Sequence, residues 1–99
     1  MNEETKVEFL QAVDVVRRMA ESLLAECRAG RRGDGIESED ELKTVLDELR
    51  EIEGQVLRGD PLPVYDGRRR LVMGRIALDW NYSKLASKVM DVCNLYRAL

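Results

Sequence analysis

Hydrophobic side chains between Leu71 and Leu99 recur at alternating steps of four and three residues, and this spacing constrains the fold more than any other feature. Such spacing stacks side chains on one face of a helix. One row comprises Leu71, Arg75, Leu78, Tyr82, Leu85, Val89, Val92, Tyr96 and Leu99, and only Arg75 breaks its hydrophobic character. A second row comprises Val72, Ile76, Ala77, Trp80, Ala86, Met90 and Cys93. Together the rows make a face too broad for one partner helix, so the segment predicts a helix with at least two neighbours.

Two earlier segments have the same periodicity. Residues 4–29 carry Phe9, Val13, Val16, Ala20, Leu23 and Cys27, and residues 38–58 carry Leu42, Val45, Leu49, Ile52 and Val56. Gly30 predicts the end of the first helix, and Ser38 with Glu41 predicts a capping box at the start of the second. We therefore predict a single all-α domain, an antiparallel bundle of three helices at about 4–29, 38–58 and 67–98, with loops at 30–37 and 59–66.

The predicted helix lengths do not match. A continuous helix over 67–98 would be about 48 Å long, whereas the helix over 38–58 would be only about 30 Å long. Either the last helix breaks near Asn81, which gives four helices, or a second copy of the chain covers its overhang. In the second case Trp80 and Tyr82 are expected at the contact, because such side chains dominate interface energetics.

Two places leave alternatives open. Residues 61–72 form either an extended loop into the last helix or a short hairpin, with Asp66-Gly67 as the turn between strands at 63–65 and 70–72. Gly54, inside the second helix, indicates either the close crossing of another helix or a frayed last turn.

The hydrophobic runs are only a few residues long, far short of the roughly 20 that cross a bilayer. The first residues, Met1-Asn2-Glu3-Glu4-Thr5, are acidic, so we expect no signal peptide or anchor and a cytoplasmic protein. Cys27 and Cys93 each lie among apolar residues and are expected to be reduced core residues.

The usual catalytic constellations are missing from the sequence. It contains no histidine and no Cys-x-x-Cys pair. Glu48 and Glu51 have a Glu-x-x-Glu spacing that can hold magnesium on a helix, but Asp79 and Asp91 do not supply a second such pair. A solvated face is the favoured interpretation of these acids, and we expect no catalytic residue, metal site or cofactor.

Charge is distributed unevenly along the chain. Residues 1–58 contain fifteen acidic and nine basic residues, whereas residues 59–99 contain four acidic and seven basic ones. Arg68, Arg69, Arg70 and Arg75 gather at the start of the last predicted helix, where cations oppose the helix dipole. They are compensated either by the acidic second helix or by an acidic partner or phosphates. Nucleic acid is the weaker interpretation, because the net charge is −3 and no aromatic residues interleave with this cluster.

Helical periodicity without catalytic residues predicts a non-catalytic protein–protein interaction module, comparable in kind to small acidic inhibitors, immunity-type proteins and adaptors. The residues expected to contact a partner protein are Arg68, Arg69, Arg70, Arg75, Trp80 and Tyr82. One alternative is a self-associating structural protein, and we expect a homodimer. A carboxylate-dependent metalloenzyme is the least favoured alternative, and no membrane partner is expected.

Overall fold

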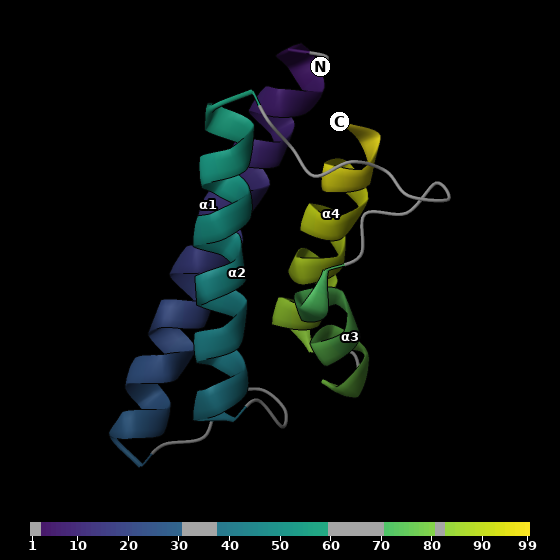
Figure 1. Ribbon diagram of the computed structural model, residues 1–99. Coiled ribbons are helices and arrows are strands. Elements are labelled where there is room, and N and C mark those ends of the chain that lie inside the picture. Colours follow the sequence, from purple (N-terminus) through teal and green to yellow (C-terminus); the bar gives the residue numbers. More distant parts are fainter. Residues whose placement is uncertain (1–2, 31–37, 60–70, 81–82) are drawn as a thin grey trace.

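The computed structural model describes residues 3–30, 38–59, 71–80 and 83–99. Within these ranges it contains four helices and no strand: α1 (Glu3–Arg28), α2 (Glu39–Leu57), α3 (Val72–Asp79) and α4 (Lys84–Ala98). Successive helices run in opposite directions, so α1 begins and α4 ends at the same end of the bundle (Figure 1). The all-α antiparallel bundle is confirmed, in its four-helix form.

The prediction of one continuous helix over 67–98 is wrong. Leu71 has an extended backbone, with φ −118° and ψ 138°, so α3 begins only at Val72, and it ends at Asp79. Ser83 is again extended, and its hydroxyl accepts a hydrogen bond from the Ala86 amide at 3.0 Å to begin α4. The break therefore lies between Asp79 and Lys84, as the four-helix alternative predicted, and the Ser83 N-cap is its local cause on the side of α4. It also removes the length mismatch that had suggested a second copy.

The loop and hairpin alternatives for residues 61–72 lie largely outside the described residues. Val72, the last residue of the alternative second strand, is helical.

Local capping sets the ends of α1 and α2. Gly30 follows α1 with φ 79°, a left-handed conformation that glycine adopts at little steric cost. At the start of α2 the Ser38 hydroxyl accepts the Glu41 amide at 3.1 Å, and the Glu41 carboxylate accepts the Ser38 amide at 3.4 Å. Both predicted helix ends are confirmed.

Gly54 is not a crossing point. Among the described residues, a methyl group at Gly54 would meet only the guanidinium of Arg58, just beyond the same helix, so none of the described helices crosses α2 there. Helix α2 continues through this glycine to Leu57.

The four helices pack as a closed ring. Helix α1 packs against α2 and α4, and α3 completes the ring by packing against α4 and α2 (Figure 1). The hydrophobic core comprises Phe9, Val13, Val16, Ala20 and Leu24 from α1; Leu42, Val45, Leu49, Ile52 and Val56 from α2; Met73, Ala77 and Trp80 from α3 and its end; and Leu85, Ala86, Val89, Val92, Cys93 and Tyr96 from α4.

The core face of α3 differs from the predicted one. Leu78 of the first predicted row is 74% exposed, and Val72 of the second row is 55% exposed. Met73, which belongs to neither row, is buried together with Ala77 and Trp80 of the second row. The four residues between α3 and α4 reset the helical phase, so one row of side chains cannot face the core in both helices.

Tyr96 joins α4 to α1 and α2 near the end of the bundle where α1 begins. The Tyr96 hydroxyl donates a buried hydrogen bond to Gln55 Oε1 at 2.8 Å, and the Tyr96 ring packs 5.8 Å from that of Phe9. On the other side of α4, a methyl group built at Gly74 would lie 3.2 Å from the Cys93 sulfur. Glycine at position 74 therefore lets α3 approach α4 closely.

Cys27 and Cys93 form no disulfide and are reduced, as expected; Cys93 is buried and Cys27 half-buried. None of the helices in the described ranges combines the length and apolar character needed to cross a bilayer.

Candidate functional site

The predicted partner-binding residues do not come together on one described surface. Arg68, Arg69, Arg70 and Tyr82 lie outside the described residues, and Arg75 is exposed on α3. Trp80 is 0% exposed, so it contributes to the core and offers no surface to a partner in this conformation. Trp80 is buried although it was expected at a partner contact, because Met73, Ala77 and Trp80 follow one another at helical spacing and form the buried face of α3. Its indole N–H donates to the Glu41 carboxylate at 3.4 Å.

Glu48, considered above as half of a magnesium pair, caps α3. Its two carboxylate oxygens accept hydrogen bonds from the amides of Val72 at 2.9 Å and Met73 at 2.7 Å. Helix α3 needs this acceptor, because its N-cap residue is Leu71, whose side chain has no hydrogen-bonding atom. A carboxylate from α2 thus takes the place of a local capping side chain, where it also complements the helix dipole.

The described side chains contain no group of three or more Asp, Glu, Cys or His placed to hold a metal ion.

The α1–α2 surface is occupied by ion pairs between its own residues. Arg17 pairs with Asp14 and reaches Glu53 across the helix boundary at 3.3 Å. Partial burial acts to lower the pKa of Arg17, but the two carboxylates outweigh it and leave that pKa raised. Because these side chains remain partly exposed to solvent, the pairs set the register of α1 on α2 more than they stabilise the fold.

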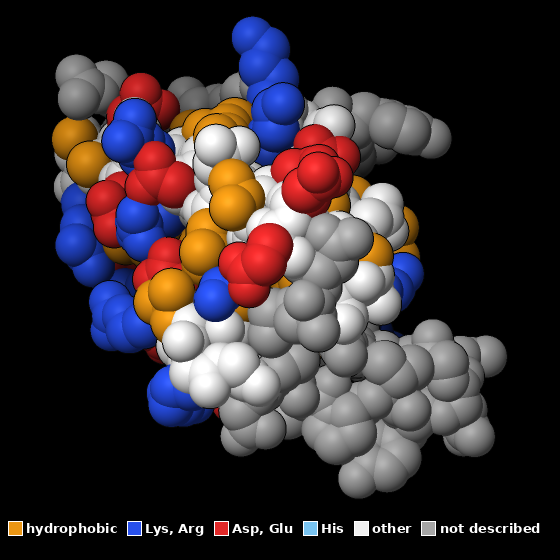
Figure 2. All heavy atoms as spheres, turned by 90° about the horizontal axis from the view of Figure 1, so that it is seen from above, with side chains coloured by type: hydrophobic (Ala, Val, Ile, Leu, Met, Phe, Trp, Pro, Cys, Tyr) orange, Lys and Arg blue, Asp and Glu red, His pale blue; other side chains and the backbone are white. Residues whose placement is uncertain are grey.

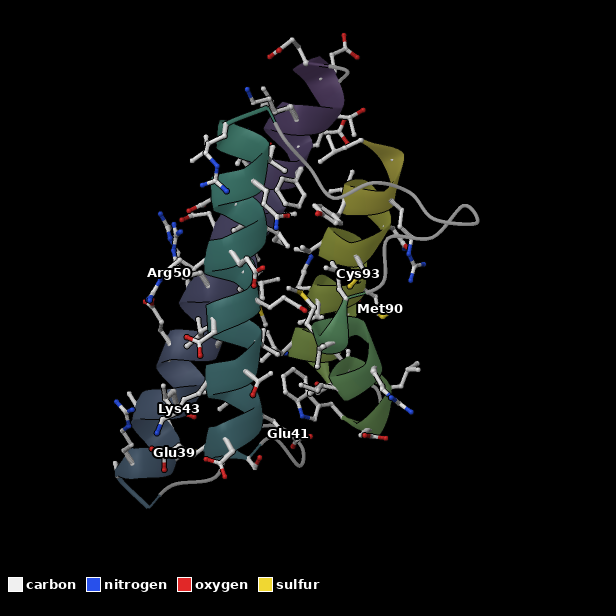
Figure 3. All side chains as sticks on the ribbon, viewed as in Figure 1. Glu39, Glu41, Lys43, Arg50, Met90 and Cys93 are labelled. Atoms are coloured by element: carbon white, nitrogen blue, oxygen red, sulfur yellow. The ribbon has the colours of Figure 1, made fainter. Side chains whose placement is uncertain are left out.

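A second set of ion pairs joins the end of α1 to the start of α2. The Arg28 side chain donates to Glu39 at 3.1 Å, and the Lys43 ammonium lies 3.5 Å from the same carboxylate. The hydrogen bond from Arg28, followed by the charge of Lys43, lowers the pKa of Glu39. Glu39 and Lys43 lie on the side of α2 next to α1, whereas Glu41 lies on the side next to α3 (Figure 3).

Cys93 lies on the side of α4 that faces α3 (Figure 3). Burial raises the pKa of its thiol to about 11, so the thiol is protonated at neutral pH. A buried, protonated thiol is a poor nucleophile.

A groove with hydrophobic residues in its lining lies between α3 and α4. This groove, of about 540 Å³ and called the α3–α4 groove below, is lined by Ala77, Leu78, Ser83, Ala86, Ser87, Met90 and Asp91. Leu78 is exposed at the edge of this groove. Half-buried Met90 lines the groove from α4 (Figure 3). Ser83, the N-cap residue of α4, and Ala86 and Ser87 within that helix are small and leave the groove open. Because α3 does not face the core with the predicted row, Leu78 lies beside the groove.

A second groove, of about 500 Å³, lies between α1 and α4. This α1–α4 groove is lined by Glu8, Gln11, Ala12, Val15, Asp91, Asn94 and Leu95. Asp91 lines both grooves, so the two meet across the outer face of α4. At the end of the bundle where α1 begins and α4 ends, hydrophobic side chains also reach the surface between acidic and basic ones (Figure 2).

Neither groove was predicted from the sequence. Their lining residues include Leu78 and Leu95, which helical periodicity assigns to a buried or flanking position. The one available signal was the Asn81-Tyr82-Ser83 break, because a new helix start at Ser83 separates the phase of the two halves.

Comparison of the chain with protein-family models, with curated proteins and with solved structures finds no match.

Proposed function

We propose that this chain is a non-catalytic protein–protein interaction module that binds another protein through the α3–α4 groove. The observation that carries the proposal is Leu78, which is 74% exposed on the rim of that groove. A single exposed leucine is common on protein surfaces, but an exposed leucine beside an apolar groove is typical of a binding site. A partner side chain in the groove would bury Leu78 and Met90 together.

The roles of the reactive side chains support a non-catalytic use. The Glu48 carboxylate caps α3, and the Cys93 thiol is buried and protonated. An inhibitor, an immunity-type protein or an adaptor needs only a shaped surface on a stable support, and the four-helix ring is such a support.

Photo-crosslinking in the native cell tests this proposal. A photoreactive residue replaces Ser87, which is exposed and lines the groove, and in a matched control it replaces Thr44, which is exposed on α2. We expect Ser87 to give a reproducible cross-link to one other protein, and L78E to reduce its yield about tenfold, because a charge would then be buried in an apolar contact. Absence of a cross-link from Ser87, or the same cross-link from Thr44, would contradict the proposal.

The second candidate is a self-associating structural protein, and the α1–α4 groove favours it, because hydrophobic residues there also reach the surface. Cross-links to a second copy of the chain from a photoreactive residue at Asn94, which is exposed and lines this groove, would support this candidate.

A further inference from the structure

We infer that the α1–α4 groove receives α4 of a second copy of this chain, which gives a two-fold symmetric dimer with the two α4 helices antiparallel. This inference deepens the self-associating candidate above and uses a different groove from the interaction module, although Asp91 lines both grooves. Leu78 lines only the α3–α4 groove, so the dimer does not use it.

The groove has the form that accepts a helix. Its floor consists of Ala12 and Val15 from α1 and Leu95 from α4, two antiparallel neighbours in the bundle. Val15 is 43% exposed although it belongs to this apolar floor. A helix laid between two neighbouring helices packs its side chains into their grooves and would bury these residues.

The charges of α4 match those of the groove. Glu8 and Asp91 are the two charged residues that line it, and both are acidic. Lys84 and Lys88 are exposed on α4. Lys84 lies seven residues before Asp91, and Lys88 lies seven residues before Leu95, so helical spacing puts all four residues on the same side of α4. No ion pair joins any of these four charged residues to another residue in the described ranges.

Antiparallel pairing brings these charges together. When the two-fold axis passes between residues 89 and 90 of α4, Lys88 of each copy lies opposite Asp91 of the other. The same register sets Lys84 of each copy opposite Leu95 of the other, beside Glu8 in the groove. Each acidic residue in the groove therefore faces a lysine, and each pairing occurs twice because the interface is symmetric. Opposite charges placed across an interface fix its register and weaken competing arrangements.

Variants that reverse the charges of Lys88 and Asp91 test the inference. We expect sedimentation equilibrium to give a concentration-dependent mass that rises from the 11.3 kDa of one chain toward twice that value. K88D and D91K are each expected to weaken the dimer by at least about tenfold, because each places like charges opposite one another. The double variant K88D/D91K is expected to restore it, because the pair is then reversed and complementary.

Two controls keep the outcome specific. D47K changes an exposed acidic residue of α2 in the same way and should leave the dimer unchanged. Raising the salt concentration should weaken the wild-type dimer, since the pairs at its rim are screened. A chain that stays monomeric at millimolar concentration overturns the inference, and so does a dimer to which K88D and D91K make no difference.

Discussion

At Cys93, burial in the core leaves the thiol protonated, although cysteine is among the most reactive residue types. Trp80 and Glu48 follow the same logic. Trp80 was expected at an interface because of its residue type, and Glu48 was considered for a metal, yet one is buried and the other caps a helix. At this scale the surroundings of a side chain, which the sequence does not give, decide its role.

The two cysteines should differ in reactivity. We expect a thiol reagent such as dithionitrobenzoate to modify half-buried Cys27 in the native protein and to reach Cys93 only when the protein unfolds. C27A and C93A identify which thiol has reacted. Modification of both cysteines at the same rate would contradict the burial of Cys93.

The same thiol makes stability depend on alkaline pH. The pKa of Cys93 is about 11 in the folded protein, above its ordinary value of 9.0, so the folded state holds the proton more tightly than the unfolded chain. This contribution is complete below about pH 9 and is lost as pH rises toward 11, and it amounts to roughly 2 kcal/mol. Urea unfolding of wild type and C93A at pH 8 and 10.5 should show the larger loss of free energy of unfolding in the wild type.

At the scale of single helices, α3 depends most on its neighbours. It has eight residues, its N-cap residue supplies no hydrogen bond, and α2 holds both of its ends through Glu48 and Glu41. Gly74 allows it to lie close to α4. In contrast, α1, α2 and α4 carry their own end signals in Gly30, in the Ser38 capping box and in Ser83.

The two helical glycines should respond differently to alanine. G54A is expected to raise the free energy of unfolding by about 1 kcal/mol, because alanine favours a helix and only the flexible Arg58 side chain must move. G74A should gain less or be destabilising, because its methyl group would press on the packed Cys93 sulfur at 3.2 Å. Urea denaturation of both variants measures the difference, and an equal gain in both would show that α3 does not need this close approach.

Across the whole molecule, periodicity predicted which side chains of α1 and α2 are buried. It did not predict the core face of α3 or the grooves between helices. The buried rows of 4–29 and 38–58 are those expected, with Leu23 and Cys27 only half-buried. The phase of α3 was wrong, because a row extended through the break assigned Leu78 to the core. The two grooves arise from how α4 pairs with α1 and α3, and spacing within one helix carries no information about that pairing. Of the predicted site residues, only Arg75 and Trp80 lie in the described part of the chain, and only Arg75 is at the surface.

Because α3 closes the ring of helices, its local unfolding should be measurable by hydrogen exchange. We expect E48Q to speed hydrogen exchange of α3 amides, about tenfold for each 1.4 kcal/mol lost, while the centres of α1 and α2 exchange as in the wild type. E51Q removes an exposed carboxylate of the same helix and serves as the control. If E48Q accelerated exchange equally in all four helices, α3 would not open separately.

The Glu48 cap also implies an order of assembly. The carboxylate and the amides it binds are 24 and 25 positions apart in the chain, and an eight-residue helix has little tendency to persist alone. Segment 71–80 therefore becomes helical only after α2 has formed and presented its acceptor. A peptide of that segment in isolation should remain a coil, and during refolding its helix should appear among the last events.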